Sequence, residues 1–197
     1  MKTTKTLLAL IAAAAMVACS KDDISYGDLD GSYELNKITY LFDGEAVLEL
    51  TPNSENWDDE LYWNEFFEKI IFEGKFVTLW LDGDFFTNKY VIDNGRISFG
   101  GLPLKFKKTT QSLTLYYSYI FDPDELDDNY YPVYDDELLE SADETVTYRG
   151  VEIHYDYLYD FDKLAYYYKG GKPVFCSTLE DDYDNWYDTI EYIYKKK

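Results

Sequence analysis

The chain has 197 residues, of which 39 are acidic and 18 are Lys or Arg, so its formal net charge at pH 7 is −21. A surface this acidic argues against nucleic acid and anionic membrane as charge-held partners, because both need basic patches. Two interpretations of the acidity stay open: it attracts a basic protein partner, or it only keeps the protein soluble.

The first 18 residues have the features of a secretory signal peptide. Lys2 and Lys5 precede an apolar run over residues 7–18, and small residues come just before Cys19. The run is too short to span a bilayer, which needs ~20 apolar residues. Cleavage before Cys19 removes these two lysines and no acid, so the net charge goes from −21 to −23.

The cleavage site resembles the lipobox of bacterial lipoproteins, in which the cysteine after the cut carries the lipid. This resemblance implies that Cys19 is acylated with more than one chain, as stable anchoring requires. The sequence Ser20-Lys21-Asp22-Asp23 resembles an export signal of surface lipoproteins in Gram-negative anaerobes, which implies an outer-membrane protein that faces outward. In the alternative interpretation, an ordinary signal peptide is cut after Ala18 and Cys19 is a free thiol.

A tether over residues 19–30 is expected to lead into one β-rich domain over residues 31–197, which is long enough for a core of its own. Four turn signals punctuate its first half: Asp43-Gly44, Glu73-Gly74-Lys75, Asp82-Gly83 and Asp93-Asn94-Gly95. Short strands with turns every ~8–12 residues predict an antiparallel barrel or sandwich. The predicted strands cover residues 32–42, 45–50, 70–72, 76–81, 85–92, 97–99, 102–106 and 113–119.

Between these strands, residues 57–67 fit either a short helix or an irregular lid. Residues 122–144 predict a long acidic loop, with eleven acidic residues and no Lys or Arg. Its alternating carboxylates make weak candidates for calcium ligands, but the third ligand position of an EF-type loop is Leu126 and the glycine is missing. No metal site is therefore assigned, and a solvated loop is the other interpretation. The candidates are Asp122, Asp124, Asp127 and Asp128.

Strand-like runs resume over residues 145–148, 151–159, 164–168 and 174–178. The C-terminus then changes period and predicts a terminal helix that packs on the sheet. Acids precede its apolar stripe and Lys195-Lys196-Lys197 follow it, which complements a helix dipole. The stripe consists of Tyr183, Trp186, Tyr187, Ile190, Ile193 and Tyr194.

The segment Leu29-Asp30-Gly31-Ser32-Tyr33-Glu34-Leu35 resembles the first strand of lipocalin-like lipoprotein domains, with Tyr33 where that family has Trp. The hairpin rhythm of residues 70–119 is also similar to their barrel. The predicted fold class is therefore all-β and mainly antiparallel: a lipocalin-like barrel or sandwich with a C-terminal helix. The resemblance implies a barrel that holds a small apolar ligand.

No catalytic motif emerges from the sequence. His154 is the one histidine, and Cys176 is the one cysteine besides Cys19. A histidine-dependent triad needs partners that the sequence does not place. We expect no cofactor and no enzymatic activity.

Three functions remain open. The first is a non-enzymatic, small-ligand-binding surface lipoprotein. The second is an acidic, Tyr-rich protein-interaction module of the inhibitor or immunity type with a basic partner. The third is a carbohydrate-binding surface built from some of the 22 Tyr and 4 Trp residues.

Overall fold

The computed structural model describes residues 24–55, 57, 67–101, 103–119, 126–127, 130, 139, 142, 144–157, 163–179 and 185–197. Within these residues the fold is all-β and antiparallel, apart from one short helix, α1 (Tyr26–Leu29). No helix in this part of the chain is long and apolar enough to cross a membrane. The helix or lid expected over residues 57–67 lies, except for its two end residues, outside the described residues.

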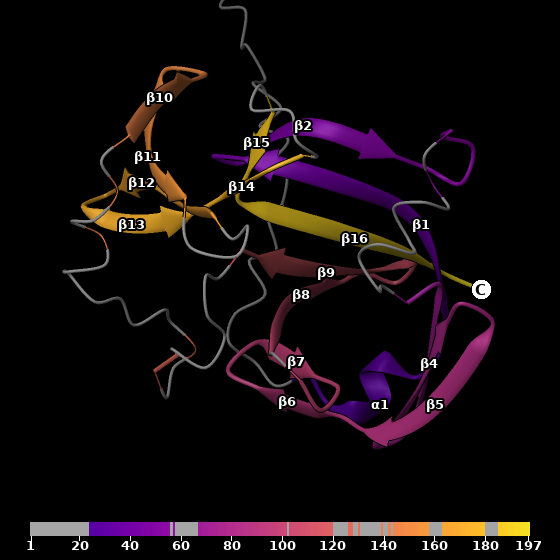
Figure 1. Ribbon diagram of the computed structural model, residues 1–197. Coiled ribbons are helices and arrows are strands. Elements are labelled where there is room, and N and C mark those ends of the chain that lie inside the picture. Colours follow the sequence, from indigo (N-terminus) through magenta and orange to yellow (C-terminus); the bar gives the residue numbers. More distant parts are fainter. Residues whose placement is uncertain are drawn as a thin grey trace, which may run out of the picture.

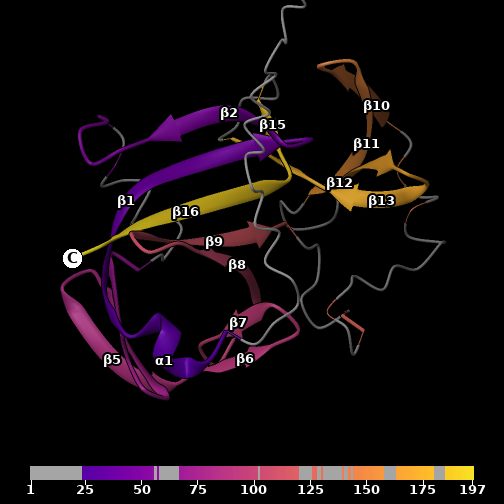
Figure 2. The ribbon, with the colours of Figure 1, turned by 180° about the vertical axis from the view of Figure 1, so that it is seen from behind.

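Nine strands curve into a nearly closed barrel, in the order β5-β4-β3-β1-β16-β9-β8-β7-β6 (Figures 1 and 2). β2 (Glu45–Leu50) pairs with β1 beside this path. The nine strands are β1 (Gly31–Phe42), β3 (Lys69–Glu73), β4 (Phe76–Leu81), β5 (Asp84–Lys89), β6 (Val91–Asp93), β7 (Arg96–Ser98), β8 (Leu104–Lys108), β9 (Ser112–Ser118) and β16 (Thr189–Lys196).

The turn signals of the sequence lie where the hairpins form. Asp43 and Gly44 have φ values of 51° and 83°, and Asp82 and Gly83 have values of 49° and 79°. Two consecutive positive φ values define the type I′ turn, whose twist matches that of the paired strands. The strand boundaries in the first half of the domain therefore follow from local turn chemistry.

The predicted C-terminal helix is wrong, because residues 189–196 form strand β16 between β1 and β9. Ile190, Tyr192 and Tyr194 alternate with more exposed neighbours and point into the core. The apolar residues of this segment satisfy both a helical and a strand period. β-Branched and aromatic residues favour a strand, and the open edges of β1 and β9 supply the partners.

A second, four-stranded sheet lies to one side of the barrel (Figure 1). It consists of β10 (Glu144–Tyr148), β11 (Val151–Tyr157), β12 (Lys163–Lys169) and β13 (Lys172–Phe175). A small ladder of β14 (Ser177–Thr178) and β15 (Trp186–Tyr187) follows it in the chain. The side chain of Phe42, at the end of β1, packs with Ile153, Tyr167 and Trp186 in a core between this sheet and the barrel strands.

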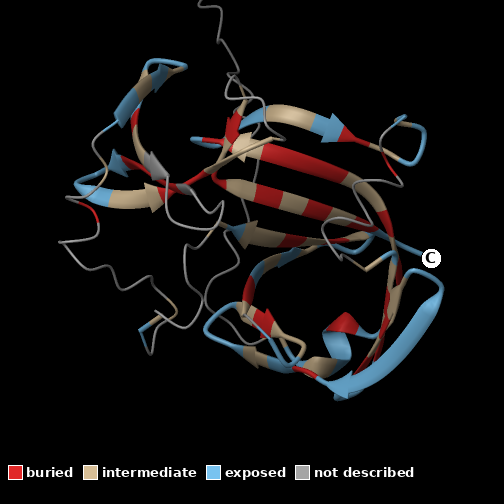
Figure 3. Cartoon of the chain, in the orientation of Figure 1, coloured by how far each residue is buried: buried red, intermediate tan, exposed pale blue. Residues whose placement is uncertain are grey.

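The barrel interior is packed with large side chains. The buried residues of its strands are coloured red in Figure 3. Phe72 lies at the centre of an aromatic group, with ring centroids 5.9 Å from Tyr33 and 4.9 Å from Tyr90. Edge-to-face pairs of this kind stabilise a core beyond the area they bury. Side chains therefore fill the barrel interior where this aromatic group lies.

Helix α1 lies within the outline of the barrel in both ribbon views and packs against the interior (Figures 1 and 2). It belongs to the segment expected to be a tether. Ser25 precedes it, and Asp28 accepts hydrogen bonds from the backbone N–H and hydroxyl of Ser25, both at 2.8 Å. Leu29 is fully buried. The Tyr90 hydroxyl lies 3.1 Å from the carbonyl oxygen of Tyr26 and 3.0 Å from that of Gly74 and shares its one proton between them, which fixes the helix to the barrel.

Tyr90→Phe should destabilise the fold by about 1–2 kcal/mol, because two carbonyl oxygens lose their donor. Burial, with a smaller contribution from Asp30, raises the pKa of Tyr90 from 10.0 to about 12. The hydroxyl is therefore more easily ionised in the unfolded chain, and its contribution to stability is complete below pH 10 and is lost as the pH rises through about 12.

Urea unfolding between pH 8 and pH 12 measures both effects, and Tyr26→Phe, which keeps the ring contact with Tyr90, is the matched control. A Tyr90→Phe protein that loses stability above pH 10 as steeply as wild type would contradict this assignment.

Candidate functional site

Most of the predicted site residues lie outside the described part of the chain. This holds for Cys19 and for Asp122, Asp124 and Asp128. Asp127 is described: its side chain is exposed, and its carbonyl accepts the N–H of Tyr130 at 2.9 Å. Among the described residues, no group of three or more His, Cys, Asp or Glu side chains is placed to hold a metal ion. Calcium binding by the acidic loop stays a prediction.

The two lone residues of interest occupy structural positions. Cys176 is buried in the core beneath the four-stranded sheet, and burial raises the pKa of its thiol well above the usual range. A protonated, buried thiol is a poor nucleophile. The His154 ring stacks on Tyr166 at 5.3 Å, and its Nε2 lies 3.4 Å from Glu152. Within the described part of the chain, neither residue lies in a group of side chains arranged as a catalytic triad or dyad.

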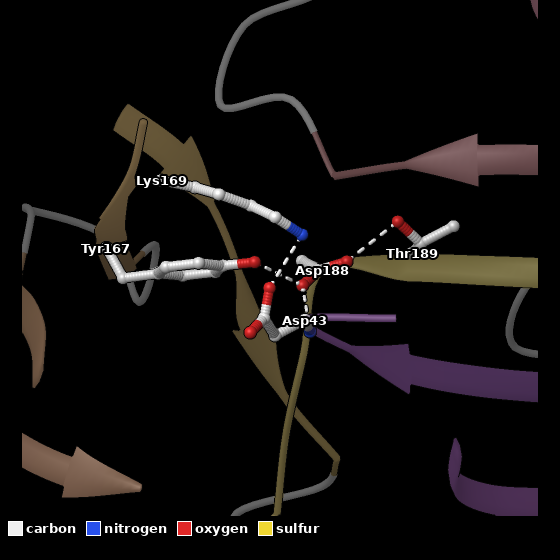
Figure 4. A network of polar contacts seen from close by, with 5 residues as sticks. All are labelled: Asp43, Tyr167, Lys169, Asp188 and Thr189. Atoms are coloured by element: carbon white, nitrogen blue, oxygen red, sulfur yellow. Dashed lines mark hydrogen bonds and ion pairs between the residues drawn. The ribbon is translucent and has the colours of Figure 1, made fainter. Parts of the chain in front are cut away.

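A buried carboxylate, Asp188, joins the barrel to the four-stranded sheet (Figure 4). Its Oδ2 accepts the Asp43 N–H at 2.7 Å and the Tyr167 hydroxyl at 2.8 Å, and its Oδ1 accepts the Thr189 hydroxyl at 2.7 Å. The Asp188 N–H donates to the carbonyl of Leu41 at 2.8 Å. One residue between β15 and β16 therefore ties together the β1–β2 turn, β12 and the barrel.

This hydrogen-bond network has a structural role: it forms the joint that holds the four-stranded sheet against the barrel. Burial, reinforced by the hydrogen bond to Asp188, raises the pKa of Tyr167 far above its usual value, so its hydroxyl stays a donor at neutral pH. The ammonium of Lys169 lies 2.6 Å from Asp43, but both side chains are largely exposed. The Asp188 oxygens are already occupied by protein donors, which argues against a reacting group.

Asp188→Ala should destabilise the protein by about 2–4 kcal/mol, because the Asp43 N–H and the Tyr167 hydroxyl lose their acceptor. It should also accelerate alkylation of Cys176 in a chain that carries Cys19→Ser, since the joint closes the core around this thiol.

Lys169→Ala is the control, because an exposed ion pair contributes only about 0–1 kcal/mol. Urea unfolding and thiol labelling give the two readouts. Equal effects of the two substitutions would refute the role of Asp188 as the joint.

The barrel interior does not favour the expected small apolar ligand. Side chains from β1, β3, β4, β9 and β16 meet there in one contiguous buried cluster. The Tyr33 hydroxyl is buried and has no hydrogen-bond partner within the described residues. Binding of a small ligand in the barrel stays a prediction.

Three of the four exposed aromatic rings among the described residues lie on β4 and β5, and the fourth, Tyr168, lies on β12. Phe85 is 62 % exposed, Phe76 50 % and Phe86 43 %. The Phe85 ring stacks on Trp80 with centroids 5.0 Å apart. The Lys69 ammonium lies 5.7 Å from the centre of the Trp80 ring. Exposed aromatic groups of this kind are typical of sites that bind other molecules.

Strand β5 also has a free edge. Its last residue, Lys89, is separated from β6 by Tyr90 alone, so the chain itself joins the two ends of the barrel path. The Tyr90 N–H donates to the carbonyl of Lys75, just before β4, at 3.3 Å. Because successive backbone groups of a strand point to opposite edges, the even-numbered residues of β5 face β4. The N–H and C=O groups of Phe85, Thr87 and Lys89 face the other edge.

No described strand pairs with this free edge. Further along the same edge, Val91 and Asp93 pair with β7. All six residues of β5 are exposed (Figure 3). Natural proteins normally pair, cover or charge such an edge, because it is a template for another strand. β5, with Trp80 and Phe76 of β4 beside it, is therefore the candidate site of the described structure, and we call it the β5 edge.

Comparisons with known proteins leave the site to be judged on its geometry. No protein-family model, no curated protein and no solved structure matches the chain.

The sequence pattern predicts one strand over residues 85–92 and does not indicate this site. The adjacent pair Phe85-Phe86 was the available signal, because neighbouring residues in a strand lie on opposite faces and a buried core takes only one of them.

Proposed function

We propose that this chain is a non-enzymatic protein-interaction module that binds a partner polypeptide by strand addition at the β5 edge. The observation that carries the proposal is an exposed strand, with one edge that no described strand pairs, beside the exposed ring of Phe85 stacked on the half-buried Trp80. In strand addition, main-chain hydrogen bonds supply affinity and side-chain pockets supply specificity.

The alternatives are less well supported. Carbohydrate binding through Tyr and Trp requires many exposed rings on one face, but among the described Tyr and Trp side chains Tyr168 alone is exposed, and Tyr33, Tyr40, Tyr167 and Trp186 are buried. A small ligand in a lipocalin-like barrel would need space that buried side chains occupy. The acidic composition remains compatible with a basic partner.

Thr87→Pro should abolish capture of partner proteins from a cell-envelope extract of the source organism by the immobilised segment 20–197. Proline removes one N–H of the free edge and leaves the ladder with β4 intact. The segment contains every element described above. Phe76→Ala is the matched control, because it removes an exposed ring of the same surface away from the edge.

Thr87→Pro also removes the Thr87 hydroxyl, which lies 2.9 Å from that of Thr78, so it could unfold β5. Phe85→Lys is therefore a second variant that tests the same edge. Circular dichroism checks the fold. Capture that is as strong with both edge variants as with wild type would rule out the β5 edge as the binding site.

We also propose that the module is displayed on the outer membrane by lipid on Cys19, as the lipobox resemblance implies. Incorporation of labelled palmitate in the bacterium should be lost in Cys19→Ser and retained in Cys176→Ser, since Cys176 is buried in the core. Label that persists in Cys19→Ser would show that this cysteine is not the anchor.

A further inference from the structure

We infer that the partner of the β5 edge is a second copy of this chain, paired antiparallel through β5 about a twofold axis at Phe86. This inference rests on the proposed function and names the partner. A twofold interface uses the same surface on both copies, so the strand has to complement itself in backbone register, side chains and charge. β5 meets each of these three conditions.

The backbone sets the register. In an antiparallel pair, residues whose N–H groups point outward must face each other, so Phe85, Thr87 and Lys89 must face odd-numbered residues of the second copy. The edge is available only as far as Tyr90, because Val91 pairs with Ser98 of β7. A twofold axis at Thr87 would place Gly83 of the second copy opposite Val91, where Ser98 already lies. An axis at Phe86 places Asp82, in the turn of the second copy, opposite Tyr90, the last available residue of the edge. It also pairs more strand residues of the two copies than an axis at Phe85 does.

The side chains suit this register. Phe86 faces Phe86 of the second copy at a non-hydrogen-bonded position, where the two strands lie closest. Aromatic cross-strand pairs are among the stabilising ones. Phe86 is 43 % exposed in the single copy and already packs 5.9 Å from Phe67, so the pairing would extend an existing ring cluster. On the outer face, Phe85 lies opposite Thr87.

The charges select the antiparallel direction. Each strand is acidic at its turn, with Asp82 and Asp84, and basic at its other end, with Lys89. The register places Lys89 of each copy opposite Gly83 of the other, whose neighbours in the chain are Asp82 and Asp84. A parallel arrangement would bring the acidic ends together. The net charge of −21 opposes self-association, but at physiological ionic strength screening acts over about 8 Å, so charges close to the interface dominate.

Cysteine cross-linking tests the register. In the segment 20–197, Phe86→Cys should form a disulfide-linked dimer under mild oxidation, because residue 86 faces itself across the axis. Phe85→Cys, which faces Thr87, should not. Cys176 is buried and common to both variants. Without oxidant, sedimentation velocity should show a dimer of the wild-type segment, and Phe86→Asp should raise its dissociation constant about tenfold or more by opposing two carboxylates.

Equal cross-linking of the two cysteine variants, or a dimer unchanged by Phe86→Asp, would overturn this pairing. A wild-type segment that stays monomeric at all accessible concentrations would overturn it as well. In each case the proposed function is judged separately: capture of another protein that is lost in Thr87→Pro would support binding at the β5 edge with a different partner.

Discussion

The pairing of β1 with β16 is the interaction on which the rest of the structure depends. The ladder runs from Tyr33 opposite Lys196 to Leu41 opposite Thr189, so it joins the two ends of the domain. A bulge between Leu35 and Lys37 bends β1, which pairs with β3 at one end and with β2 at the other. Since nearly the whole chain lies between these partners, the barrel cannot close until the C-terminus is available, and such distant contacts are slow to form.

Two consequences follow from that central pair. At one end, β16 begins directly after Asp188, which fastens the four-stranded sheet through Tyr167. At the far side of the barrel, the strand path ends at β5 and β6, which only Tyr90 connects. The closure is thus covalent as well as hydrogen-bonded, and no strand of the described structure pairs with the outward groups of Phe85, Thr87 and Lys89. The candidate site is a product of incomplete closure.

Local signals in the sequence predicted much of the first half of the domain. Asp43-Gly44 and Asp82-Gly83 mark turns because few residues tolerate positive φ. The strands on either side of these turns are present in the structure. The prediction of a terminal helix was wrong because the segment fits two periods. Ile190, Ile193 and Tyr194 fit a helix, whereas Ile190, Tyr192 and Tyr194 fit a strand, and only the presence of β1 and β9 selects the strand. The junction at Asp188 has no local signal, since its partners come from distant segments.

The sequence by itself determined the all-β class, the hairpin turns and the acidic, aromatic composition, because these depend on residues close together in the chain. The expected lipid at Cys19 is likewise a local feature of the sequence. Only the tertiary structure decided which aromatic rings are buried, that the barrel interior is packed, and that one edge of β5 has no partner among the described strands. Burial and strand pairing depend on which distant segments meet, and a strand such as Phe85–Lys89 has the same local pattern whether its second edge is covered or open.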